Sequence, residues 1–222
     1  MTVYEKGAEI IRMQHTLLGE ETYRKATDLY FERFDGCAVT CDDFVSCMSD
    51  ASKRDMDHFF LWYKQAGTPS IDVKGNYNEA QKRFTLTFKQ SQPDTPNQTN
   101  KKPLHIPIAV GLLNENGDEI ESTKILEMTE REQSFSFDNV ASRPIPSILR
   151  NFSAPVKLTT DLSDSDLRLL QLHDTDGFNR WEAGQTLALR TIEDLMTDKK
   201  SNISQFVDNF GVLIEQGFDK GC

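Results

Sequence analysis

The residue types that most often bind metals or attack substrates are few in this sequence. No two histidines have the spacing of H-E-x-x-H, which places two imidazoles on one helix face for zinc. The cysteines lack the C-x2-C pair of a structural zinc site, and no G-x-S-x-G, Walker A or G-x-G-x-x-G motif occurs. We therefore expect neither a metal site nor a complete active site within these 222 residues. The side chains considered are His15, His58, His105, His173, Cys37, Cys41, Cys47 and Cys222.

The stretch from Asp174 to Gly177, Asp-Thr-Asp-Gly, has the beginning of a calcium-binding loop. Its glycine stands at the fourth position rather than the sixth, and Gln185 occupies the place of the bidentate glutamate. We interpret this stretch as a turn between two helices.

Tyr4 is the side chain with the clearest possible catalytic role. It lies in the first turn of an expected helix, where Thr2 and Glu5 have the spacing of a capping box. A neutral phenol is a good hydrogen-bond donor at neutral pH. A donor held rigidly at such a place can stabilise a developing oxyanion. From its spacing alone, a tyrosine here is more often a core or surface residue.

Hydrophobic spacing divides the chain into three segments that must position these side chains. Residues 1–66 have helical periodicity, and the last of their four expected helices covers residues 55–65. Residues 67–158 change to a period of two, which predicts a small Ig-like antiparallel β-sandwich. Residues 159–222 return to helical spacing. We therefore predict a multi-domain α and β chain: a helical block, a sandwich and a helical segment.

Within the middle segment, alternating apolar residues indicate strands, whereas the polar, proline-containing stretch 91–103 indicates a loop. The expected strands lie around Ile71–Val73, Phe84–Phe88, Ile106–Leu112 and Phe135–Phe137.

Composition excludes some functions. The formal net charge of −10 opposes general nucleic-acid binding, which needs a concentrated basic face. No run approaches the roughly 18 apolar residues of a membrane span, so we expect no membrane partner. Because residues 1–20 lack a signal-peptide pattern, we expect reduced thiols and a cytoplasmic location.

Several stretches, in order, resemble the aminopeptidase N family of zinc metallopeptidases (gluzincins), and most closely its bacterial-type alanyl aminopeptidases. The resemblance covers essentially the whole chain. It is carried by Thr2–Met13, Thr40–Phe44, Trp62–Pro69, Lys102–Pro107, Phe152–Val156 and Phe178–Ala183.

This resemblance implies that the chain is a fragment of a zinc-dependent aminopeptidase that removes N-terminal amino acids from peptides. Residues 1–66 would end a thermolysin-like catalytic domain, 67–158 would be the sandwich, and 159–222 would open a C-terminal helical domain. Tyr4 matches the family tyrosine that donates to the tetrahedral oxyanion. H-E-x-x-H and G-x-M-E-N, which supply zinc ligands and hold the substrate amine, are not in this sequence, and its substrate-binding residues are unknown.

The zinc of the parent enzyme is therefore not expected in this fragment, and we predict that the isolated chain is inactive. Its expected partners are the missing catalytic and C-terminal domains of the same chain. The alternative is a non-enzymatic protein-interaction module with a β-sandwich core, in which Tyr4 is structural. Reading upstream of Met1 for an in-frame H-E-x-x-H distinguishes the two.

Overall fold

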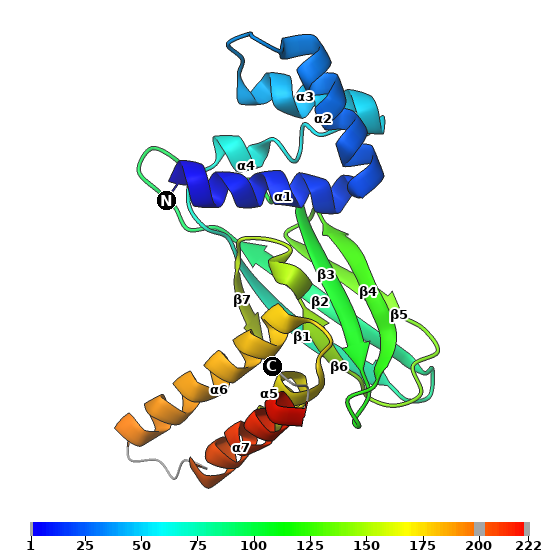
Figure 1. Cartoon of the computed structure of the whole chain (residues 1–222), viewed down its shortest axis with the longest axis vertical. Coiled ribbons are helices and arrows are strands. Elements are labelled where there is room, and N and C mark those ends of the chain that lie inside the picture. The colour runs from blue at the N-terminus through cyan, green and yellow to red at the C-terminus, as the bar shows by residue number, and fades with distance from the viewer. Residues whose placement is uncertain (1, 198–202, 220–222) are drawn as a thin grey trace.

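The fold has three parts along its length: a helical block at one end, a β-sandwich in the middle and three helices at the other end (Figure 1). This computed structural model describes residues 2–197 and 203–219, so Cys222 lies outside the described residues. The three-part architecture predicted from hydrophobic spacing is confirmed.

The helical block begins with a π-helical turn, η1, that continues into the first α-helix. Lys6 joins the two with helical backbone angles, φ −64° and ψ −36°. Gly19, at φ 75°, ends one helix and precedes the next. The elements are η1 Thr2–Lys6, α1 Gly7–Leu18, α2 Glu20–Phe34, α3 Cys41–Ser52 and α4 Leu61–Lys64.

Local side-chain chemistry sets the start of α3. The Thr40 hydroxyl accepts from the backbone N–H of Asp43, and the Asp43 carboxylate accepts from the backbone N–H of Thr40 at 2.8 Å. These reciprocal bonds satisfy donors that a helix start leaves free. The capping box expected at Thr2 involves a side chain outside the described residues.

The helix expected over residues 55–65 is wrong in extent, because α4 covers only its last turn. The Asp55 carboxylate accepts from the backbone N–H of Asp57 at 2.8 Å, which holds the chain in a turn. The backbone N–H of Trp62 then donates to the carbonyl of Phe59 at 3.1 Å, a tighter spacing than that of an α-helix. This path buries both aromatic side chains in the core.

The sandwich consists of two sheets, with strand orders β5-β2-β1-β7 and β4-β3-β6. Among the described strands, β1 pairs in parallel with β7 and the other pairs are antiparallel. The strands are β1 Ser70–Asn78, β2 Arg83–Ser91, β3 Ile106–Leu113, β4 Glu119–Met128, β5 Glu132–Phe137, β6 Ile145–Ile148 and β7 Lys157–Thr160.

The four expected strands correspond to β1, β2, β3 and β5, and the main apolar core combines residues of both sheets with residues of α1, α3 and α4. The sequence did not reveal β4, β6 or β7. β4 is mostly exposed and rich in charged residues, while β6 and β7 have only four residues each. β7 pairs with β1 and extends the sheet to Thr160, beyond residue 158.

The third part contains α5 Asp164–His173, α6 Gly177–Met196 and α7 Ile203–Asp219. A capping box of Ser163 and Asp166 begins α5, as expected from their spacing. A second apolar core joins α5 and α6 to Leu113 and Ile145 of the sandwich.

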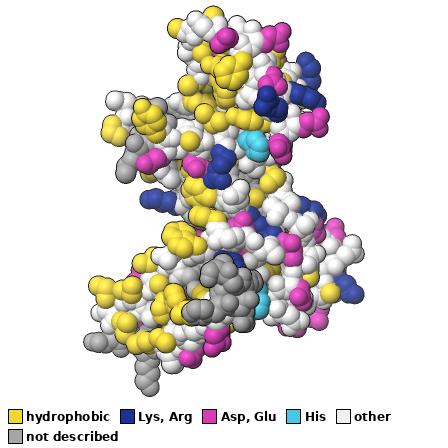
Figure 2. Space-filling view, in the orientation of Figure 1, with side chains coloured by type: hydrophobic (Ala, Val, Ile, Leu, Met, Phe, Trp, Pro, Cys, Tyr) yellow, Lys and Arg dark blue, Asp and Glu magenta, His cyan; other side chains and the backbone are white. Residues whose placement is uncertain are grey.

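The outer faces of α6 and α7 carry exposed apolar side chains, and Figure 2 shows hydrophobic atoms gathered over this end of the molecule. None of the described helices is both long enough and apolar enough to cross a membrane. The exposed residues include Trp181, Leu189, Ile192, Leu195, Met196, Ile203, Val207 and Phe210.

Candidate functional site

Tyr4 lies on η1 at the N-terminal end of the longest helical run of the first part. Its side chain is 85% exposed. The phenol makes no hydrogen bond with any other residue that the structure describes, so its O–H is free to donate outward. The structure thus presents the predicted donor on the surface rather than in the core.

Lys6 anchors the helical turn that carries Tyr4. Its Nζ donates to the carbonyl of Gly67 at 2.7 Å, where the helical block meets the sandwich. Burial, followed by the positive charge of Lys101, lowers the pKa of the Lys6 ammonium. Lys101 itself donates to the neighbouring carbonyl, that of Ala66, at 2.8 Å. Two ammonium groups therefore hold two consecutive carbonyls at this junction.

Arg12 anchors the same helical run six residues further along. Its Nη1 donates to the carbonyl of Asn151 at 2.5 Å, and its Nη2 donates to the carbonyl of Phe152 at 2.6 Å. The guanidinium also pairs with Glu9 on its own helix and lies 5.7 Å from the centre of the Phe152 ring. A planar guanidinium suits such forked binding better than an ammonium does.

The two carbonyls belong to an unusual turn, η2 Arg150–Phe152. Leu149, Asn151 and Phe152 all have left-handed backbone angles, with φ of 60°, 53° and 48°. Non-glycine residues in this region cost about 1–3 kcal/mol each. Surrounding contacts must therefore hold the turn in this shape.

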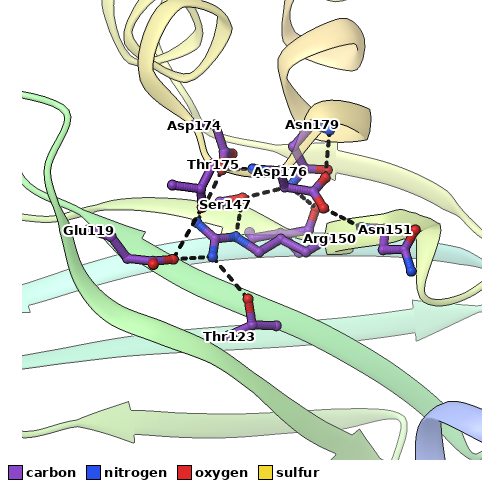
Figure 3. A network of polar contacts seen from close by, with 10 residues as sticks. Glu119, Thr123, Ser147, Arg150, Asn151, Asp174, Thr175, Asp176 and Asn179 are labelled. Carbon is purple, nitrogen blue, oxygen red and sulfur yellow. Dashed lines mark hydrogen bonds and ion pairs between the residues drawn. The ribbon is translucent and has the colours of Figure 1, made fainter.

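Arg150 supplies those contacts from inside the turn (Figure 3). Its Nη2 donates to Asp174 at 3.1 Å, its Nε donates to Ser147 at 2.8 Å, and its Nη1 pairs with Glu119. The Asp174 side chain is 0% exposed, and burial raises the pKa of its carboxyl group. A Cβ placed on Gly111 would lie 2.2 Å from the Arg150 Cζ, so only glycine allows this approach.

The stretch from Asp174 to Gly177 is a turn between helices, as the sequence indicated. Asp174 ends α5, and the Asp176 carboxylate begins α6 by accepting from the backbone N–H of Asn179 at 2.8 Å. The other Asp176 oxygen accepts from the backbone N–H of Asn151 at 2.9 Å, which joins this turn to η2. The sequence did not predict the Arg150 cluster, because its members come from separate elements.

Two of the four histidines come together where the segment before α4 meets the segment before β3. The rings of His58 and His105 lie 5.9 Å apart, and His105 Nε2 is 2.8 Å from Glu127, which also pairs with Arg54. Burial lowers the pKa of His105 despite the raising effect of Glu127.

The described residues offer no set of zinc ligands. No group of three histidine, cysteine, aspartate or glutamate side chains suited to a metal ion occurs within residues 2–197 and 203–219. The thiols of Cys37, Cys41 and Cys47 are free. We therefore assign no metal chemistry to the described residues.

Models of known families match three consecutive stretches. Residues 1–63 match the peptidase family M1 domain, residues 67–161 match a domain of unknown function with an Ig-like fold (DUF3458), and residues 164–221 match one with ARM repeats (DUF3458_C). A crystal structure of Legionella pneumophila aminopeptidase A in complex with aspartic acid resembles 96% of this chain, with a TM-score of 0.86 and 36% identity. Residues 1–63 thus match the domain of peptidase family M1, and the chain as a whole is similar to a part of an aminopeptidase.

The chain is also similar to aminopeptidase N of several bacteria. It is 51% identical to the Escherichia coli protein over 84% of this chain, and 50% identical to the Caulobacter vibrioides protein over 84%. The chain spans only 22% of the length of each of these relatives, and 24% of the Legionella protein. The resemblance seen in the sequence is confirmed. The chain corresponds to a part of the aminopeptidase fold, not to all of it.

Proposed function

We propose that this chain is part of a zinc-dependent aminopeptidase that removes N-terminal amino acids from peptides, and that Tyr4 donates a hydrogen bond to the oxyanion of its tetrahedral intermediate. The observation that carries the proposal is an exposed phenol on an anchored turn within the stretch that matches the M1 peptidase domain. A rigid donor costs little reorganisation when charge develops on the substrate oxygen.

The described residues do not fit the zinc ion of such an enzyme, since they contain no suitable ligand cluster. We propose that the ligands and the groups that hold the substrate amine come from another part of the parent protein. On this view, the chain contributes Tyr4 and the support for it, and the isolated chain is inactive.

We also propose three functional units: residues 1–66 as the end of the catalytic domain, the sandwich from 67 to about 158, and the first C-terminal helices. The partners of the outer units are the remaining domains of the same protein. The free, exposed thiols of Cys37 and Cys41 support a cytoplasmic location as part of this proposal.

The proposal is tested on the complete reading frame that contains these residues. We expect an in-frame H-E-x-x-H upstream, bound zinc and hydrolysis of an alanyl chromogenic substrate. Tyr4→Phe should lower kcat about 100- to 1,000-fold, as removal of an oxyanion donor does elsewhere. Tyr30→Phe, which removes the hydroxyl of a tyrosine packed among aromatic rings on α2, serves as the control. A stop codon directly upstream, together with no turnover, would support the interaction-module alternative, whereas wild-type kcat in Tyr4→Phe would overturn the proposed role of Tyr4.

The isolated chain of 222 residues gives a second test. We expect neither stoichiometric zinc nor turnover of the same substrate by this chain. Stoichiometric zinc together with turnover would show that these residues form a complete site.

A further inference from the structure

We propose that Lys6 and Arg12 are positioning residues for Tyr4: they fix the helical run η1–α1 to backbone carbonyls of two separate segments of the sandwich, the one that leads into β1 and the turn η2. This inference rests on the proposed function, because it concerns how the oxyanion donor is held in place. It gives the sandwich a mechanical role in a reaction that occurs in another part of the protein.

The first step is the continuity of the helical run. η1 passes into α1 through Lys6 without a break in helical geometry. Two anchors six residues apart fix the direction of the helix axis, and the turn that carries Tyr4 continues that helix beyond the first anchor. Tyr4 is only two residues from the first anchor and eight from the second, and because it is 85% exposed, its own packing can do little to hold it.

The second step is the chemistry of the two anchors. Both are cations that donate to carbonyl oxygens, at 2.7 Å for Lys6 and at 2.5 and 2.6 Å for Arg12. Charge-assisted hydrogen bonds are about twice as strong as neutral ones. The Arg12 fork binds two carbonyls and so restricts direction as well as distance, whereas the Lys6 ammonium binds one carbonyl and mainly restricts distance.

The third step is the rigidity of the acceptors. Gly67 has a φ of 95° and lies beside Lys101, which holds the adjacent carbonyl. On the other side, the left-handed turn η2 aims the carbonyls of Asn151 and Phe152 at Arg12, while the Arg150 cluster fixes the turn from within (Figure 3). The Arg150 cluster includes Asp174 at the end of α5, so the C-terminal helices also support the Tyr4 helix through this turn.

Hydrogen exchange on the 222-residue chain tests the anchoring without any need for activity. Arg12→Met and Lys6→Met should each lower the protection of the amides at residues 7–12 about tenfold, because one anchored end is released. Protection in α5 and α6 should stay unchanged. Arg24→Met is the matched control, since Arg24 is an exposed arginine whose ion pair lies within α2.

A second control separates the two interactions of Arg12. Glu9→Gln removes the ion pair on the helix but leaves both carbonyl contacts, so protection should be retained. Arg12→Lys, which can reach one carbonyl, should give an intermediate loss. Unchanged protection in both Arg12→Met and Lys6→Met would overturn the anchoring.

Kinetics of the polypeptide from the complete reading frame test the role in catalysis. Arg12→Met should lower kcat about tenfold with unchanged KM, and this loss should disappear in a Tyr4→Phe background, since Arg12 acts through Tyr4. If the losses of kcat from Arg12→Met and Tyr4→Phe add in the double variant, the positioning role of Arg12 is overturned, while the proposed function stands. Wild-type kcat in Tyr4→Phe would overturn the proposed function and, with it, the positioning role, whatever the exchange data show.

Discussion

Replacing Arg150 with methionine should destabilise the chain strongly. The Arg150 side chain is 4% exposed and compensates the charge of Asp174, which is fully buried. Removing one partner of a buried pair costs about 3–5 kcal/mol, because the other charge is left uncompensated. Glu119 adds little to this loss, since its side chain is 31% exposed and can be solvated.

The loss of stability in Arg150→Met should depend on pH, because Asp174 can be protonated. Burial already raises the pKa of Asp174, so the carboxyl group favours folding when it is protonated, and this contribution is lost as pH rises through its folded pKa. Loss of Arg150 raises that pKa further. The destabilisation of Arg150→Met should therefore be largest near pH 7 and shrink as pH falls towards 4.

Urea unfolding followed by circular dichroism measures the free energy, and a thermal scan should show a decrease in Tm of about 6–20 °C. Arg83→Met is the matched control, because Arg83 pairs with Asp138 on the exposed surface of the same sandwich. The control should lose less than about 1 kcal/mol. An equally small loss in Arg150→Met, or a loss that grows at low pH, would refute the reasoning.

Three further changes test the approach of Gly111 to Arg150, the ionisation of Asp166 and the packing of Phe59. Gly111→Ala should lower the Tm, because its Cβ would lie 2.2 Å from the Arg150 Cζ, and a wild-type Tm would contradict this contact. Asp166→Asn should reduce the loss of stability on acidification, measured by urea titration at several pH values. Burial opposes ionisation of Asp166, but hydrogen bonds led by that of Arg143 outweigh it and lower its pKa, so its contribution is lost as pH falls through that value. Phe59→Ala should cost about 3–5 kcal/mol in the same assay, since the ring is fully buried; a loss below about 1 kcal/mol would place it outside the core.

Periodicity alone predicted most of the fold. Two local patterns repeat every few residues: the apolar spacing in α1 and α2, and the alternation in β1, β2 and β3. Such patterns can be detected in a single sequence. The elements that were missed have weak local signals. β4 is charged and exposed, β6 and β7 are four residues long, and the turn before α4 depends on how two aromatic rings reach the core.

For the candidate site, the sequence by itself supplied Tyr4 as a candidate, showed the family resemblance and predicted the turn between α5 and α6. It could not identify Arg12 or Arg150 as supports. Arg12 binds carbonyls 139 and 140 residues away. Every residue has a carbonyl, so no side-chain pattern marks these acceptors. Only the tertiary structure, by bending the chain at η2 into a left-handed turn, decided which of them point at the helix that carries Tyr4.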